Sequence, residues 1–251
     1  LDDMVTVAAG EFVMGDDHVP FSAPRRKTFV KAFKIDRYEV TNEAYQAFVI
    51  EAKHRQPELM DEWAADYSWR ENQYPEGTKD QPVVLVSYVD AQKYCNWRGA
   101  RLPIEAEWEK AARGTTGRVY PWGDKWDGRK SHTVERLSGP LTSAKDWEDF
   151  EKNFDADQLI RPFAVGSYPE DISAFGVVDA HGNVQEWVDD LFEAPEGGDA
   201  AESELYTRKD VAIAKGTSFV NRDYAAPLSA RFPYKMTHRE TNIGFRCAKD
   251  I

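Results

Sequence analysis

The sequence is poor in cysteine, with only Cys95 and Cys247 in 251 residues. Neither lies in a CxxC pair or beside a histidine, which disfavours a thiolate metal site or a local redox motif. From the residues alone, two unrelated buried thiols and one disulfide bridge both remain open. A bridge would close a loop of about 150 residues and would anchor a C-terminal strand that could otherwise fray.

Several other features are missing. No apolar run approaches the roughly 18 residues of a membrane span, and the N-terminal stretch lacks the pattern of a signal peptide. The first residue is Leu, which fits either a mature exported chain or a shortened one. The GxSxG, HExxH and Walker patterns are absent, which disfavours the common hydrolase and nucleotide-binding templates. The formal net charge of −12 argues against nucleic acid and anionic membranes as partners.

Regular elements are predicted mainly in the first half of the chain. Alternating apolar residues over 5–14 predict a short hairpin or bulged strand pair around Gly10. A strand is predicted over 29–35, followed by a helix that Thr41 caps. That helix has apolar residues at helical spacing, namely Ala44, Tyr45, Phe48 and Val49.

The following segment contains the clearest boundaries. A strand over 83–86 leads into a helix that Ser87 or Asp90 caps and that ends at Gly99. A second helix is predicted over 103–114, with a proline at its first position and a closing glycine. Glutamates in its first turn and basic residues in its last turn suit the helix dipole.

Periodicity is weak in the rest of the chain, where short apolar pieces alternate with turn residues. Long irregular segments of this kind are usually functional or held by disulfides or metal ions. The acid-rich stretches 145–157 and 193–204 are interpreted as solvated loops, with cation binding as the alternative. No internal repeat is present. The sequence therefore predicts a single α+β domain over 1–251 with abundant loop.

The five histidines are scattered, so no local motif predicts an iron or zinc site. One oxygen-rich turn, "FGVVDAHGNVQEWVDD", places Asp179, Asn183 and Glu186 within eight residues. Gly182 permits a tight turn, and oxygen ligands suit Ca²⁺. His181 is the wrong ligand type and is interpreted as a bystander. The alternative is a polar turn that leads into a strand.

An ordered set of motifs identifies a family. The motifs include "FKIDRYEVTNEAYQAFV", "YPWGD", "FGVVDAHGNVQEWV", "KGTSF" and "NIGFRCA", in order from residue 4 to 248. Together they closely resemble the formylglycine-generating, sulfatase-modifying superfamily. The resemblance implies that family's single-domain fold, which is related to C-type lectins and poor in regular secondary structure. It also implies a structural disulfide between Cys95 and Cys247.

The resemblance further implies two calcium sites. The first is the oxygen-rich turn, where the glycine and the valine would bind through their carbonyls: Asp179, Gly182, Val184 and Glu186. The second has a histidine where asparagine is common in the family: His132, Thr133, Asp157 and Leu159.

The departures from the family pattern bear on activity. Catalytic members have two copper-binding cysteines in the segment that here reads "GTSFVNRDYAAPLSARF", which contains none. Copper–dicysteine chemistry is therefore excluded. Gln185 stands where a cleft tryptophan is usual. The chain begins at the family core, so the iron-binding domain of ergothioneine-forming members is not expected.

The sequence is most similar to the cysteine-poor branch that matures the pyoverdine siderophore. This likeness implies a periplasmic oxidoreductase that converts the dihydropyoverdine chromophore to pyoverdine, with a peptide siderophore precursor as partner and an unknown catalytic cofactor. The alternatives are an inactive lectin-like binding module and an accessory maturation factor for a secreted metalloenzyme.

The family cleft supplies the candidate catalytic residues. Tyr224 or Asp223 could move a proton, and Arg222 could hold an anionic group. The full candidate set is Ser218, Asn221, Arg222, Asp223, Tyr224 and Gln185, with Arg231, His238 and Arg239 nearby in sequence.

Overall fold

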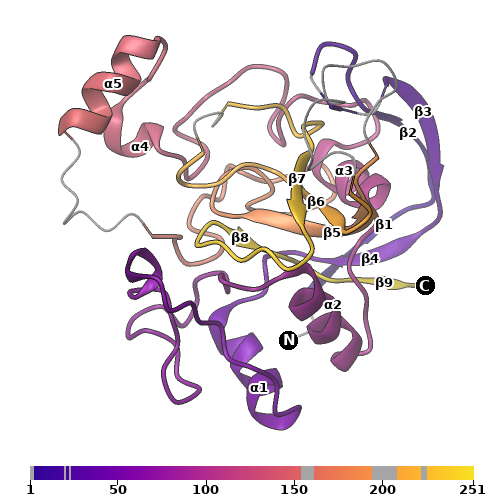
Figure 1. Ribbon diagram of the computed structural model, residues 1–251. Helices are drawn as coiled ribbons and strands as arrows, with labels where there is room; N and C mark the ends of the chain where they lie inside the picture. The colour runs from indigo at the N-terminus through magenta and orange to yellow at the C-terminus, as the bar shows by residue number, and fades with distance from the viewer. Residues whose placement is uncertain (1–2, 20, 23, 154–160, 194–207, 222–224) are drawn as a thin grey trace.

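A computed structural model describes residues 3–19, 21–22, 24–153, 161–193, 208–221 and 225–251. It shows an α+β fold in which loops connect short strands and helices, as predicted (Figure 1). The helical elements are α1 (Asn42–Glu51), η1 (Glu62–Ala64), α2 (Tyr88–Trp97), α3 (Glu105–Arg113), α4 (Glu135–Ser138) and α5 (Ala144–Asn153). The strands are β1 (Met4–Val7), β2 (Gly10–Met14), β3 (Arg26–Val30), β4 (Phe33–Asp36), β5 (Gln185–Leu191), β6 (Val211–Lys215), β7 (Phe232–Lys235), β8 (Ile243–Gly244) and β9 (Ala248–Asp250).

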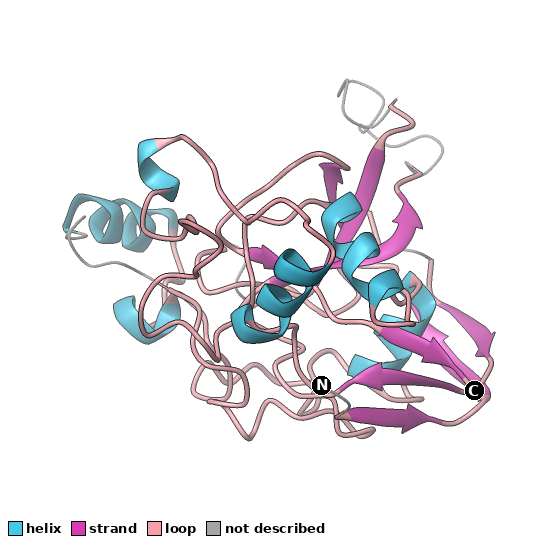
Figure 2. Cartoon of the chain, turned by 90° about the horizontal axis from the view of Figure 1, so that it is seen from below, coloured by secondary structure: helices cyan, strands magenta, loops and turns pink. Residues whose placement is uncertain are grey.

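The described strands form three small sheets. The sheet with order β7-β6-β5-β8 lies at the centre, and β8 pairs with β5 in parallel whereas the other pairs are antiparallel. A second sheet has the order β1-β4-β9, and β2 pairs with β3 alone. Figure 2 shows helices packed between the strands and the looped part of the chain. β6 is buried on both faces and supplies Val211 and Ile213 to one hydrophobic core and Ala212 and Ala214 to another.

The N-terminal strands form, but the predicted hairpin between them is wrong. β1 pairs with β4, and β2 pairs with β3, so the two neighbours join different sheets. Gly10 takes φ +147° at the point where the chain changes sheets, a conformation that favours glycine. Lys110 of α3 holds this link by donating from Nζ to the carbonyls of Ala8 and Gly10, at 2.6 and 3.0 Å. The strand predicted over 29–35 is likewise divided into β3 and β4.

The predicted helix caps are confirmed. Thr41 Oγ1 accepts a hydrogen bond from Ala44 N at 3.2 Å, which begins α1. Ser87 and Asp90 form a reciprocal capping box at the start of α2, so both predicted residues contribute. Gly114 takes φ +73° and ends α3. α3 begins at Glu105, two residues after the predicted proline start.

The strand predicted over 83–86 is absent. All four residues are buried, but Leu85 has φ +58°, which is incompatible with a continuous strand. The segment instead packs its apolar side chains as an irregular loop. Backbone and side-chain groups from elsewhere bond to it: Val83 N donates to Val40 O at 2.9 Å, and Trp187 Nε1 donates to Val86 O at 3.1 Å.

Part of the acid-rich stretch 145–157 is helical rather than loop. Ser143 and Asp146 form reciprocal hydrogen bonds at the start of α5. Asp146 N donates to Ser143 Oγ, and Ser143 N donates to Asp146 Oδ2. Trp147 and Phe150 pack against each other on its apolar side. In the described part of the chain, no helix is long and apolar enough to cross a membrane.

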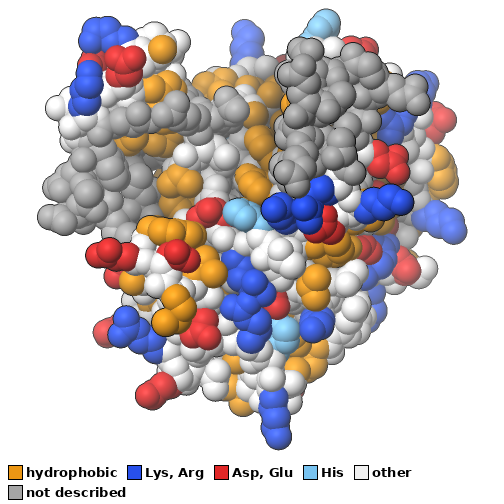
Figure 3. All heavy atoms as spheres, in the orientation of Figure 1, with side chains coloured by type: hydrophobic (Ala, Val, Ile, Leu, Met, Phe, Trp, Pro, Cys, Tyr) orange, Lys and Arg blue, Asp and Glu red, His pale blue; other side chains and the backbone are white. Residues whose placement is uncertain are grey.

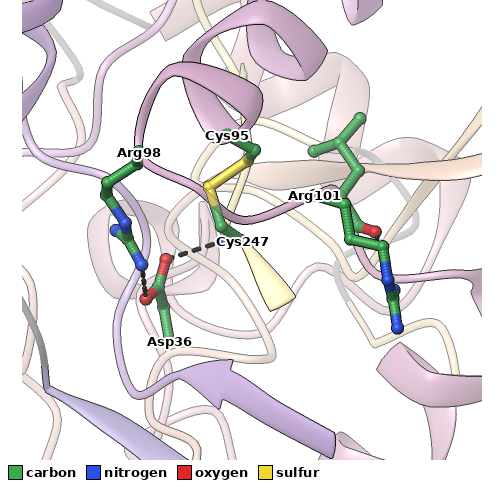
Figure 4. Close-up of a disulfide and its surroundings, with 6 residues drawn as sticks. Asp36, Cys95, Arg98, Arg101 and Cys247 are labelled. Carbon is green, nitrogen blue, oxygen red and sulfur yellow. Dashed lines mark hydrogen bonds and ion pairs between the residues drawn. A yellow bond between two sulfur atoms is a disulfide. The ribbon is translucent and has the colours of Figure 1, made fainter. Parts of the chain in front are cut away.

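The predicted disulfide is present. Cys95 of α2 is bonded to Cys247, which directly precedes β9, across a sequence separation of 152 residues (Figure 4). The sequence contains no other cysteine, so no free thiol remains. Beside the bridge, the Asp36 carboxylate accepts a hydrogen bond from Arg98. Its Oδ2 accepts a second hydrogen bond from Cys247 N at 2.9 Å. The bridge therefore joins α2 to the three-stranded sheet.

Asp190 provides a pH-dependent contribution to stability. It accepts from Glu105 N, the first residue of α3, at 2.5 Å. Burial, with a smaller contribution from the neighbouring carboxylates Glu105 and Asp189, raises its pKa to about 6. Because the folded pKa exceeds the unfolded value, this stabilisation is complete below pH ~4 and is lost as the pH rises to about 6.

We expect the free energy of unfolding to decrease by about 1–2 kcal/mol over that interval, after allowance for partial solvent screening. Urea unfolding at several pH values would measure it. Asp190→Asn should remove this part of the pH dependence, whereas the exposed control Asp66→Asn should retain it. An unchanged pH profile in Asp190→Asn would contradict the assignment.

Candidate functional site

The candidate site centres on Ser218, which follows β6 and is fully buried. Its hydroxyl donates to Asn221 Oδ1 at 2.5 Å and accepts from Asn242 Nδ2 at 3.0 Å. Asn242 lies directly before β8, and its carbonyl accepts from Gln185 N at 2.9 Å. Ser218, Asn221 and Gln185, three of the predicted cleft residues, are thus brought together, with Asn242 linking them.

Gln185 extends this network toward β7. Its Oε1 accepts a 2.8 Å hydrogen bond from the hydroxyl of Tyr234. Tyr234 in turn stacks on His238, with ring centroids 5.0 Å apart. Burial raises the pKa of Tyr234 to about 12, so its hydroxyl keeps its proton at neutral pH. Burial also lowers the pKa of His238.

Two amide atoms in this network have no hydrogen-bond partner among the described residues. They are Gln185 Nε2, a donor, and Asn242 Oδ1, an acceptor, and both are buried. A buried polar group without a partner costs about 1–3 kcal/mol unless water or a ligand satisfies it. The network can therefore offer both a donor and an acceptor to a bound polar molecule.

His181, predicted to be a bystander to calcium binding, packs against the segment that contains Ser218. Its Nδ1 lies 3.1 Å from Ser131 Oγ and 3.3 Å from Thr217 Oγ1, and its Nε2 lies 3.2 Å from Ala226 O. Three aromatic rings surround it: Tyr120, Trp122 and Trp126. Burial lowers its pKa to about 3, so it stays neutral and fixes the chain on both sides of the site.

Two other predicted cleft residues are paired elsewhere. Arg231 is paired with Glu105 of α3, Nε to Oε1 at 3.0 Å. Arg239 is paired with Asp90 of α2 at 2.9 Å. Arg222, Asp223 and Tyr224 lie outside the described residues, so their predicted roles stay predictions.

The oxygen-rich turn leads to a buried ion pair. Both oxygens of Glu186 accept from Arg246, from Nε at 2.6 Å and from Nη2 at 2.7 Å, and Oε2 also accepts from Trp108 Nε1 at 2.8 Å. Arg246 donates further to the carbonyls of Arg37 and Val178. A guanidinium thus lies against Glu186, which was predicted as a calcium ligand.

Three more buried carboxyl groups surround this pair: Glu39, Asp171 and Asp179. Burial is the main cause that raises the pKa of each, to about 6 for Asp179 and well above the usual range for the other two. Asp179 Oδ2 accepts from Gly166 N at 2.5 Å. One guanidinium therefore faces four carboxyl groups, and protonation offsets part of the excess negative charge.

Glu186 does not fit a calcium ligand in this arrangement, because three N–H groups already occupy its oxygens. Asp179, Gly182 and Val184 lie in the same turn, but among the described residues no group of three or more His, Cys, Asp or Glu side chains is placed to hold a metal ion. We therefore assign calcium no role in the chemistry below. Calcium at this turn stays a prediction, which elemental analysis of the purified protein would check.

The second predicted calcium site is only partly described. The His132 ring stacks on Phe163, with centroids 4.0 Å apart, and its Nε2 lies 2.9 Å from Arg161 O. Its imidazole is therefore engaged in packing. Thr133 is buried beside it. Asp157 and Leu159 lie outside the described residues, and this site also stays a prediction.

Comparison with known proteins places the chain in a family. The family model described as the sulfatase-modifying factor enzyme 1-like domain matches residues 1–251. The chain belongs to the sulfatase-modifying factor family. A bovine member named inactive C-alpha-formylglycine-generating enzyme 2 is 30% identical over 98% of this chain and 87% of its own length.

Other members of the sulfatase-modifying factor family differ in activity. The hercynine oxygenase of Mycolicibacterium thermoresistibile is 34% identical over 65% of this chain, which corresponds to 37% of that protein. The structure of PvdO from Pseudomonas aeruginosa is similar with a TM-score of 0.71 and 24% identity, covering 100% of this chain and 96% of that one. The family thus includes an oxygenase as well as an inactive member, and its fold is the fold described here.

Sequence reasoning missed Asn242, Tyr234 and the role of His181. Asn242 is the first residue of the "NIGFRCA" motif, which was the available signal. Tyr234 lies on β7, where no periodic pattern points to the site. Acidic and basic side chains are interspersed over the face in Figure 3, so the net charge of −12 forms no single patch there.

Proposed function

We propose that this chain is a thiol-independent tailoring oxidase that converts a dihydropyoverdine-type chromophore to pyoverdine in the periplasm. One observation carries the proposal: both cysteines form the disulfide, while the family site contains a hydrogen-bonded group of Ser218, Asn221, Gln185 and Asn242. Such a site has no thiolate for copper. It can bind and orient a polar substrate.

The proposed reaction is a dehydrogenation. The dihydro chromophore loses two hydrogen atoms, and dioxygen accepts them to form hydrogen peroxide. The substrate's own catechol makes it electron-rich, so the protein's task is to hold it and to assist proton removal. Gln185 Nε2 and Asn242 Oδ1 supply an unpaired donor and acceptor that can hold the substrate. The proposed proton acceptors are Asp223 and Tyr224, which lie outside the described residues.

Two indirect arguments support the proposal. The chain shares its fold with PvdO over its full length, and its family includes an oxygenase. The disulfide suits an oxidising compartment such as the periplasm. The expected partner is a peptide siderophore precursor.

Purified protein should convert dihydropyoverdine to the fluorescent product under air, with one peroxide formed per product. Tyr234→Phe removes the hydroxyl that orients Gln185, and we expect turnover to decrease about tenfold with little change in thermal stability. Tyr74→Phe, whose ring contacts Trp69 instead, is the matched control. Absence of product under air, with or without added copper or iron, would refute the oxidase.

A binding module is the second candidate, favoured by the 30% identity to a member named inactive. It predicts that calorimetry detects 1:1 binding of the siderophore precursor without product. Ser218→Ala would weaken this binding, because Ser218 holds both Asn221 and Asn242. Product formation by the wild-type protein would exclude this alternative.

A further inference from the structure

A pocket of about 530 Å³ lies beside the disulfide, between the end of β4 and helices α1 and α2. This volume is within the range of small-molecule sites. No residue of the Ser218 network lines it, so it is separate from the candidate site. Its lining residues fall into charged groups (Asp3, Asp36, Glu39, Glu43 and Arg98), tyrosines and small apolar or hydroxyl side chains.

The pocket is acidic. Four of its lining side chains are carboxylic acids, against one arginine. Arg98 is already paired with Asp36, which also accepts from Cys247 N, so the guanidinium is neutralised inside the fold. Asp3 and Glu43 are more than half exposed at the rim. Their partners do not line the pocket, and exposed pairs of this kind hold little energy. Arg98 and Asp36 offset each other, which leaves Glu39 as the buried carboxyl group of this lining without a paired cation. Burial raises the pKa of Glu39 well above its usual range, so a cation bound beside it would favour its carboxylate form.

One buried carboxyl oxygen at this pocket has no hydrogen-bond partner among the described residues. Glu39 is 2% exposed, and while its Oε1 accepts from Asn183 Nδ2 at 3.2 Å, its Oε2 accepts from no described group. The Tyr94 side chain is fully buried, and its hydroxyl interacts with Arg98 without a well-aligned hydrogen bond. Folding left the Glu39 oxygen buried and unsatisfied, which costs free energy that a bound donor would recover.

The remaining lining fits a short carbon chain with a cationic end. Val40, Ala44, Ala47 and Val165 provide apolar contacts, and Tyr38 and Tyr94 are aromatic rings suited to a cation. An anion would meet the carboxylic acids and an arginine that is already paired. We propose that this pocket binds a small organic cation, an alkylammonium or alkylguanidinium, which donates hydrogen bonds to Glu39 and Tyr94.

Calorimetry on the purified protein tests this with agmatine and putrescine as probes, and with butyrate and 1-butanol as charge controls. The expected result is 1:1 binding of the amines, with no heat from butyrate or butanol. The proposal does not depend on the proposed oxidase activity, because the assay contains no siderophore.

Three variants localise the binding. Glu39→Gln should weaken amine binding by at least about tenfold, and Tyr94→Phe, which removes only the hydroxyl, by about threefold to tenfold. Ala47→Leu should abolish binding by filling the pocket. Glu11→Gln, on the exposed face of β2, is the matched control and should bind normally. Circular dichroism would confirm that each variant is folded.

Three results would overturn the proposal. The first is that neither amine binds at millimolar concentration. The second is that butyrate binds in their place, which would make Arg98 an anion site. The third is an amine affinity that is unchanged in both Tyr94→Phe and Ala47→Leu. The amine would then bind elsewhere on this acidic protein, and this conclusion would hold even if Glu39→Gln failed to fold.

Discussion

Replacing both cysteines by alanine should lower the free energy of unfolding by about 5 kcal/mol, because the bridge closes a loop of 152 residues. This loss is comparable to the whole stability of many domains. The bridge joins α2 to the residue before the C-terminal strand, and both cysteines lie in the core. Urea unfolding of the wild-type and the double variant at neutral pH would measure the difference.

Reduction provides the control for this prediction. The wild-type protein unfolded in urea without reductant should show no reactive thiols, and two after reduction. The free energy of unfolding of the double variant should not change when reductant is added. A double variant as stable as the oxidised wild type would mean that the closed loop contributes nothing, and that packing of β9 alone holds the C-terminal segment.

Replacing Arg246 by methionine should cost about 3–5 kcal/mol, because it leaves Glu186 as a buried unpaired charge. The expected loss is large here, since Arg246 is also the cation whose charge favours the ionised forms of Glu39, Asp171 and Asp179. Arg246 also donates to the carbonyls of Arg37 and Val178, which would lose a partner.

A second variant separates charge from packing. Arg246→Met combined with Glu186→Gln removes the unpaired carboxylate and should recover most of the loss. Arg129→Met is the control, because Arg129 forms an exposed pair with Asp127 and should change stability little. If the double variant were as unstable as Arg246→Met, the hydrogen bonds of the guanidinium, rather than its charge, would dominate.

Local signals in the sequence predicted local structure well. Thr41, Ser87 and Asp90 cap helices through bonds to residues within three positions, so their roles follow from the sequence. The same kind of signal at Ser143 and Asp146 marks α5, but the acidic composition concealed it. The segment 83–86 was mistaken for a strand because its apolar composition cannot reveal the left-handed backbone at Leu85.

The candidate site was only partly predictable for a different reason. The family resemblance supplied Ser218, Asn221 and Gln185, whereas Asn242 and Tyr234 reach them only through tertiary contacts. The Ser218–Asn242 bond spans 24 positions and the Tyr234–Gln185 bond 49, and no periodic pattern extends so far. Likewise, the pairing of Glu186 with Arg246 could not be read from a turn that also suits a cation.

The segment 243–250 has a consequence for how the chain reaches its fold. β8 completes the central sheet, Arg246 neutralises the buried carboxylates, Cys247 secures α2, and β9 completes the second sheet. Until these eight positions have been synthesised, two sheets lack a strand, α2 lacks its disulfide partner and Glu186 lacks its guanidinium. We therefore expect folding to be completed only after this segment leaves the ribosome, and nascent chains that lack it to remain protease-sensitive.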